Sequence, residues 1–354
     1  MSSLWSIFRL PKKRELRRSL AKNQGRGDLM NWIASQFARG EFAFAQKSPP
    51  SQTGLMTQKK LTALIRAGYG QGHFQRYKPW LRVTKRDYSP NSNIGHLPAI
   101  SLARQHHYRA RAERQTIQVT KWLGAIDVRE GYPVWPWSHP HPGNGLPGFE
   151  NARRLAGLQE IANEAGIPHG NFPGTDIPYV ATLDVLTTWQ DANGNYSLIA
   201  FENKPEEFTY AKQPISRTKE RLELTRRYCA RATIPHRIVH AEKLPAELVV
   251  NLDMLEPQLT NQRQQQIIES ETYQAVIDVI NTHGLLSSMN ELLDGIGCQK
   301  NVSEPELTTA LHLALWRQDV DHDLRQPLRP WEPLIPGGRS FKEALFKAWV
   351  ESKA

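Results

Sequence analysis

The stretch YVATLDVLTTWQDANGNYSLIAFENKP, residues 179–205, decides the fold of this chain. Residues 179–188 and 196–204 are rich in β-branched and aromatic side chains, which favour strands. The five residues between them, DANGN, contain the Asn-Gly pair that is typical of a tight turn between antiparallel strands. The stretch therefore predicts a β-hairpin.

Three charged side chains interrupt this hairpin. Asp184 lies in an otherwise apolar strand, where a carboxylate is unfavourable unless something binds it. Glu202 and Lys204 share one face of the second strand, because side chains alternate along a strand. Hard divalent cations prefer carboxylate oxygens, and such cations promote phosphodiester hydrolysis. The pattern indicates a nuclease site in which Asp184 and Glu202 bind Mg²⁺, with Mn²⁺ as a substitute, while Lys204 orients water or neutralises charge on the phosphate.

The length of the hairpin loop decides whether these side chains share one site. A two-residue turn would place Asp184 opposite Asn203, and therefore on the other face from Glu202. A shared site needs an odd loop, for instance 192–194 with Gly194 left-handed, or a β-bulge. We predict such a loop or bulge. The alternative is that Asp184 is a satisfied buried residue and that the second strand ends as an exposed edge.

The hairpin lies within a series of alternating elements. After residue 247 we predict a second, mostly helical domain with helices at 261–282, 285–295 and 304–318. The order around the hairpin is αβββαβ, with a helical insertion after the first strand, which predicts an α/β fold with a small sheet flanked by helices. Its other elements are a helix at 108–122, a strand at 125–130, a Pro/Gly-rich loop at 134–148, a helix at 151–165, a helix at 216–232 and a strand at 236–240.

Charge is distributed unevenly along the chain, whose net charge is +10. Residues 1–60 carry 12 Lys/Arg against 3 Asp/Glu, residues 61–150 carry 12 against 5, and the remaining 204 residues carry 21 against 27. This excess predicts a polyanionic partner such as nucleic acid, with a solubilising basic tail as the alternative and anionic membrane as a weaker one. A Pro/Ser-rich linker closes the basic extension, so we divide the chain at 1–55, 56–246 and 247–354.

Several residue types argue against other classes of protein. Cys229 and Cys298 are the two cysteines, and their spacing supports neither a disulfide framework nor a thiolate zinc site. No apolar run approaches ~18 residues and the start lacks a secretory leader, so we expect a cytoplasmic protein. His139 and His141 have no nearby third ligand, which favours a stiff extended loop. The glycines of 68–73 lack the spacing of a P-loop or a dinucleotide-binding turn.

Several motifs in a fixed order resemble the TnsA-type endonuclease subunits of heteromeric bacterial transposons, which have a PD-(D/E)xK active site. The similarity spans roughly residues 60–255 and implies a restriction-endonuclease-like core followed by a winged-helix-like domain. The motifs that carry it lie at 68–73, 76–81, 126–133, 161–169, 202–205 and 222–228.

The resemblance also implies roles for individual residues. Glu113 matches the helical active-site glutamate of the family and is a further metal ligand, and Asp184 and Lys204 match the catalytic aspartate and lysine. Glu202 departs from the pattern, since the archetypal member has glutamine there, which leaves the ligand set open. We expect three basic residues near the start of the nuclease domain to contact DNA: Arg66, Arg76 and Lys78.

The implied function is cleavage of double-stranded DNA at transposon ends, on the 5′-side strands. The implied partners are a TnsB-like DDE transposase and a TnsC-like AAA+ ATPase, in the bacterial cytoplasm. Two alternatives stay open: a free-standing restriction or repair nuclease of the same fold, and a non-catalytic DNA-binding adaptor.

Overall fold

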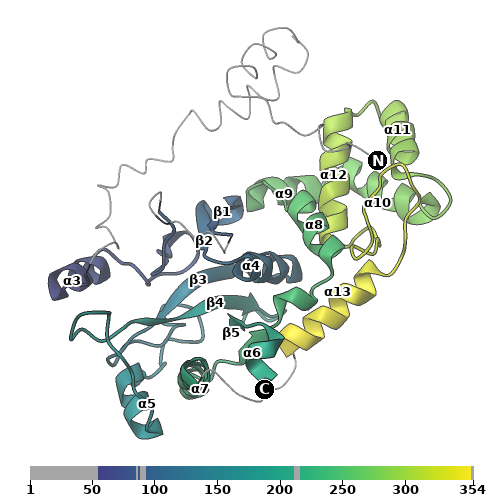
Figure 1. Ribbon diagram of the computed structural model, residues 1–354. Coiled ribbons are helices and arrows are strands. Elements are labelled where there is room, and N and C mark those ends of the chain that lie inside the picture. The colour runs from purple at the N-terminus through teal and green to yellow at the C-terminus, as the bar shows by residue number, and fades with distance from the viewer. Residues whose placement is uncertain (1–54, 85–86, 88–92, 211–215, 352–354) are drawn as a thin grey trace, which may run out of the picture. The chain divides into compact units, whose positions relative to one another are not determined.

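A four-stranded mixed sheet, in the order β3-β4-β5-β6, forms the middle layer of the protein (Figure 1). The computed structural model describes residues 55–84, 87, 93–210 and 216–351, so the predicted basic extension lies outside the described residues apart from its last position. Neighbouring strands pair antiparallel except for β5 and β6, which are parallel. The strands are β3 (Asp127–Val134), β4 (Ala181–Gln190), β5 (Tyr196–Asn203) and β6 (His236–Val239).

Helices cover both faces of this sheet, because alternate residues of the central strands are apolar on each side. Val185 and Phe201 belong to the core that includes α4, whereas Leu186 and Ala200 belong to the core that includes α5 and α7. The chain order is α4-β3-β4-β5-α7-β6, with α5 between β3 and β4, as predicted. These helices are α4 (Arg111–Leu123), α5 (Leu158–Ala165) and α7 (Ser216–Arg231), and the short α6 (Glu206–Tyr210) follows β5.

Two predicted element boundaries in this layer are wrong. β3 continues past residue 130 to Val134, the first residue of the predicted loop, because residues 132–134 pair with residues 181–183 of β4. α5 begins at Leu158 rather than at 151, because Gly157 lies against the carbonyl of Pro136, where a Cβ would come within 2.1 Å of the oxygen. That contact joins distant parts of the chain, so local helix propensity does not report it.

A hairpin that the sequence did not predict, β1 (Gly95–Ala99) and β2 (Arg104–Tyr108), packs on β3 through a buried carboxylate. Glu130 accepts hydrogen bonds from Arg104 at 3.0 Å and from the backbone N–H of His107 at 3.0 Å, and its Oε2 lies 2.9 Å from Nδ1 of His106. Although burial opposes the charge of Glu130, Arg104 and His106 lower the pKa of this carboxyl to about 2. This buried group of hydrogen bonds around Glu130 anchors the hairpin.

An amphipathic helix, α3 (Gln58–Arg66), begins the described part of the nuclease layer. Thr57 caps it by accepting a hydrogen bond from the N–H of Lys60, and its apolar stripe is buried. Leu61 and Leu64 form a small core with residues that include Trp135, directly after β3, and Val180, directly before β4. α3 therefore packs beside the start of β4.

The described residues after 245 form helices and no strand, so the predicted helical character is present but no β-wing is seen within 246–351. The predicted helix at 261–282 is two helices, because Ser270 caps a new one, and α11 begins at 289 because Ser288 and Glu291 form a capping box. No helix among the described residues is long and apolar enough to span a membrane. The helices are α8 (Ala246–Leu255), α9 (Asn261–Ile268), α10 (Glu271–His283), α11 (Met289–Lys300), α12 (Glu304–Arg317) and α13 (Gly338–Phe346).

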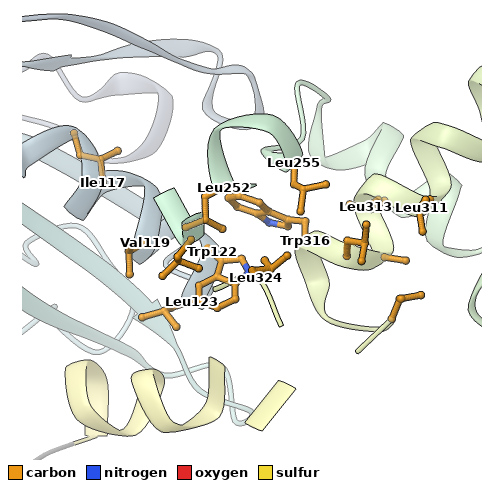
Figure 2. Close-up of a cluster of buried hydrophobic side chains, with 14 of the residues drawn as sticks. Ile117, Val119, Trp122, Leu123, Leu252, Leu255, Leu311, Leu313, Trp316 and Leu324 are labelled. Atoms are coloured by element: carbon orange, nitrogen blue, oxygen red, sulfur yellow. The ribbon is translucent and has the colours of Figure 1, made fainter. Parts of the chain in front are cut away.

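One hydrophobic core joins these helices to the sheet layer. Figure 2 shows Trp122 of α4 among side chains of α8 and α12, including Leu252 and Trp316. Trp122 and Leu252 are completely or almost completely buried, and ion pairs from Arg114 to Asp253 and from Lys121 to Glu256 flank the α4–α8 contact. Residues 52–354 accordingly form one compact unit.

Candidate active site

The β4–β5 hairpin closes through a loop of odd length, as predicted. The N–H of Asp191 donates to the carbonyl of Asn195 at 3.0 Å, which leaves Ala192, Asn193 and Gly194 in the loop. Gly194 is left-handed with φ 83°, and the Asp191 carboxylate accepts from the N–H groups of Asn193 at 2.9 Å and Asn195 at 2.8 Å. Paired positions on the two strands therefore have even sums, as in Val185 opposite Phe201 (386).

This register brings the three predicted hairpin residues together at one end of the sheet. Continued by one residue, it places Asp184 opposite Glu202. The Nζ atom of Lys204 lies 3.7 Å from Oδ2 of Asp184 and 3.5 Å from Oε2 of Glu202. The N–H of Asn203 donates to Oδ2 of Asp184 at 2.7 Å and so orients that carboxylate. Two carboxylates and one ammonium group meet where β4 begins and β5 ends.

The start of α4 is tied to the same end of the sheet. Thr116 donates through its hydroxyl to Oδ1 of Asn203 at 2.5 Å. Glu113 lies one turn earlier on α4, and its Oε2 accepts from the N–H of Arg109 at 2.7 Å. These two contacts bring Glu113 close enough for the charges of Asp184 and Lys204 to act on it.

The electrostatics of this group are those of crowded negative charge. Burial and then the charge of Asp184 raise the pKa of Glu113 to about 7, well above its usual range. Burial also raises the pKa of Asp184, to which the charge of Glu202 adds. Although burial would lower it, the neighbouring carboxylates raise the pKa of Lys204, so its ammonium group stays charged. Three carboxyl groups surround one positively charged side chain, the Lys204 ammonium group, so the site has an excess of negative charge.

A divalent cation fits the chemistry of this site, since its donors are carboxylate oxygens and its excess charge is negative. The ligands are not assembled in advance: in the described ranges, no three His, Cys, Asp or Glu side chains converge as a ready cation site. The Lys204 ammonium lies between Asp184 and Glu202 instead. A cation held by Asp184 and Glu202 together would take the place that the Lys204 ammonium group has here.

The basic residues predicted to contact DNA differ from one another in the structure. Arg66, at the end of α3, and Arg76, in a short 3-10 turn, are exposed. Lys78 is half-buried, donates to the carbonyl of Ala67 at 2.9 Å and lies 5.9 Å from the ring centre of Tyr69. Lys78 is therefore engaged in holding the loop that follows α3.

The two histidines of the Pro-rich loop are engaged within the protein. Nε2 of His139 lies 3.0 Å from the hydroxyl of Tyr228, and Nε2 of His141 lies 2.8 Å from the carbonyl of Ala232. Both partners belong to α7 or follow it directly. The contacts fasten the loop to α7, in agreement with a stiff extended segment.

Sequence reasoning did not identify four residues that shape the site. Thr116 and Asn203 join α4 to β5, Arg109 holds Glu113 through its backbone, and His236 lies beside Glu202. Their roles could not be read from the sequence, because three act through contacts between distant segments and Arg109 acts through a backbone group. Asn203 lies within the motif at 202–205 and His236 begins a predicted strand, but neither signal indicated a contact with the site.

The structure thus holds a mixed sheet between helices, with two carboxylates and a lysine at the ends of adjacent strands and a helical glutamate nearby. Residues 157–241 match the family described as TnsA-like endonuclease N terminal. The chain is also 27% identical over 201 residues to the Transposon Tn7 transposition protein TnsA of Escherichia coli, an alignment that covers 56% of this chain and 63% of that protein. The resemblance to TnsA-type endonucleases is thus confirmed, and the family match contains Asp184, Glu202 and Lys204 but not Glu113.

Proposed function

We propose that this chain is the metal-dependent endonuclease subunit of a heteromeric transposase, which cuts the 5′-side strands at transposon ends. The observation that carries the proposal is the meeting of Asp184, Glu202 and Lys204 at the end of the β4–β5 hairpin, in a chain similar to TnsA. The cofactor we propose is Mg²⁺, for which Mn²⁺ can substitute.

Each side chain has a distinct task in the proposed reaction. Asp184, Glu202 and Glu113 would hold the cation, which when bound polarises the phosphate and lowers the pKa of an attacking water. Asn203 keeps one oxygen of Asp184 in place through its backbone N–H. Lys204, released from the carboxylates, pairs its ammonium group with a phosphate oxygen, where negative charge develops in the transition state.

The substrate and partners belong to the same proposal. Exposed Arg66 and Arg76, together with the basic excess of the first 150 residues, suit the phosphates of double-stranded DNA. A TnsB-like DDE transposase would process the other strand, and a TnsC-like AAA+ ATPase would regulate both subunits in the bacterial cytoplasm. We assign the contact with these partners to the helices after residue 246, whose acidic balance suits protein better than DNA.

The test is strand cleavage of DNA that carries the ends of the element encoding this chain, with its transposase partner present. Asp184→Ala and Lys204→Ala should each lower cleavage about a hundredfold or more, because the first removes a proposed metal ligand and the second removes the ammonium group that pairs with a phosphate oxygen. Asp278→Ala, an exposed position on α10, is the matched control and should cut normally. A folded Asp184→Ala protein with normal cutting would refute the nuclease assignment, and a wild-type protein that binds DNA without cutting would favour the adaptor alternative.

A further inference from the structure

His236, the first residue of β6, lies beside the proposed active site on the neighbouring strand. In the parallel β5–β6 ladder, Ala200 is opposite His236 and Glu202 is opposite Ile238. Residues two apart on a strand share a face, so Glu202 and His236 are diagonal neighbours on one side of the sheet. Nε2 of His236 lies 3.5 Å from Oε1 of Glu202, and their side chains are 9% and 6% exposed.

Neither of these two atoms has another hydrogen-bond partner in the part of the chain that the structure describes. The hydroxyl of Thr225 donates to backbone carbonyls of α7 at 3.0 and 3.1 Å, and it also helps to lower the pKa of the Glu202 carboxyl. Leaving a buried polar atom without a partner costs ~1–3 kcal/mol. A small rotation of either side chain shortens the 3.5 Å separation to a normal hydrogen bond of ~2.9 Å.

The two oxygens of Glu202 therefore have different neighbours. Oε2 faces Lys204 and, beyond it, Asp184, whereas Oε1 faces His236. A carboxylate held at one oxygen cannot turn freely about its last bond, so its other oxygen keeps a constant direction. Oε2 is then held on the side of Lys204, whose ammonium group also lies beside Asp184.

We propose that His236 is a positioning residue, which donates from Nε2 to one oxygen of Glu202 and thereby aims the other at the cation site. The inference rests on the proposed function, because it takes Glu202 as a metal ligand. The inference also accounts for a glutamate at position 202. Its Oε1, which points away from Lys204, needs a hydrogen-bond donor, and His236 on β6 supplies one. Hydrogen bonds of this kind to metal ligands typically affect metal affinity ten- to a hundredfold.

The experiment measures Mn²⁺ binding to the full chain by electron paramagnetic resonance of the free ion, without DNA and without turnover. Three substitutions separate positioning from mere burial. His236→Gln places an amide donor near the position of Nε2, whereas His236→Asn places one near Nδ1 and His236→Ala has none. We expect His236→Gln to keep the affinity within about threefold, and His236→Asn and His236→Ala to weaken it about tenfold or more. His283→Asn, exposed on α10, is the control.

The outcomes distinguish this inference from the proposed function. If the wild-type protein shows no Mn²⁺ binding that Asp184→Ala abolishes, the metal site itself is refuted. If that binding exists and His236→Asn binds as tightly as His236→Gln, the positioning role is refuted alone. Equal loss of affinity in the Gln and Asn variants, with equal loss of melting temperature, would assign His236 a structural role and also overturn the inference. Should His236→Ala fail to fold, the Asn and Gln pair still decides.

Discussion

Replacing Glu113 by glutamine should stabilise the metal-free protein while it removes the proposed nuclease activity. The side chain lies in the first turn of α4, where its oxygen accepts a hydrogen bond from the N–H of Arg109. The amide oxygen of glutamine can accept the same bond. What glutamine removes is a negative charge held close to Asp184 in a partly buried place, and the folded state gains from that removal.

The size of this gain follows from the pKa of Glu113, which burial and the charge of Asp184 raise from 4.5 to about 7. A raised carboxyl pKa means that ionisation opposes folding, so the cost is absent below 4.5 and complete above about 7. The difference corresponds to at most about 3 kcal/mol, and to about 1–3 kcal/mol once solvent access to the half-buried side chain is taken into account. Glu113→Gln should therefore exceed the wild type in stability by about that much at pH 8 and by much less at pH 5.

Urea unfolding at pH 5 and pH 8 in the presence of a chelator measures this difference. Glu160→Gln is a matched control, because Glu160 occupies the same third position of α5 but is exposed. It should cost only about 0.3–1 kcal/mol through the helix dipole, with little change between the two pH values. A Glu113→Gln protein that is less stable than the wild type at pH 8, or equally more stable at both pH values, would refute the crowded-charge reasoning. Added Mg²⁺ should remove the wild type's disadvantage.

Three further predictions concern the fold and the basic extension. Leu252→Ala should destabilise the protein by about 2–5 kcal/mol within one urea transition, because Leu252 is fully buried in the core that joins the sheet layer to the later helices; separate transitions would contradict that continuity. The free energy of unfolding should fall by up to about 3 kcal/mol as pH drops from 6.5 to 4, because burial lowers the pKa of His106 to about 4. His106→Asn keeps a donor toward Glu130 and should flatten this pH dependence. An unchanged slope in that variant would refute the assignment to His106. Deleting residues 1–55 should weaken DNA binding and lower its salt dependence, which filter binding at several salt concentrations measures; an unchanged slope would assign that segment to another partner.

The β4–β5 hairpin could be predicted because its determinants are local. The Asn-Gly pair, the alternation of apolar residues and the need for a shared face at Asp184 and Glu202 all lie within 27 consecutive residues. The order of the αβββαβ elements was predictable for the same reason. The predicted helix start at 151 and the single predicted helix at 261–282 were wrong. A contact with Pro136 delays the first helix to Leu158, and the Ser270 side-chain cap begins a new helix within the second.

The part of the site contributed by α4 could not be derived from the residues alone. Glu113 was chosen because of the resemblance to a family, since a glutamate on a helix is usually a solvated surface residue. Its place near Asp184 depends on the Thr116–Asn203 hydrogen bond, which joins positions 87 residues apart. The β1–β2 hairpin was missed for a similar reason, because its polar strand is buried by pairing with Glu130 on β3.

The core shared by α4, α8 and α12 has a consequence for how this protein can be divided. A chain cut after residue 246 would expose Trp122 and Leu123 to water, on the same helix that carries Glu113. A truncated nuclease layer should then aggregate or lose the alignment of its first helix, however intact its sheet. The sheet layer and the later helices should therefore evolve together. A substitution that changes the volume of the side chain at Trp122 calls for a compensating substitution at Leu252 or Trp316. Exchanging the later helices for those of a relative would require exchanging this face of α4 as well.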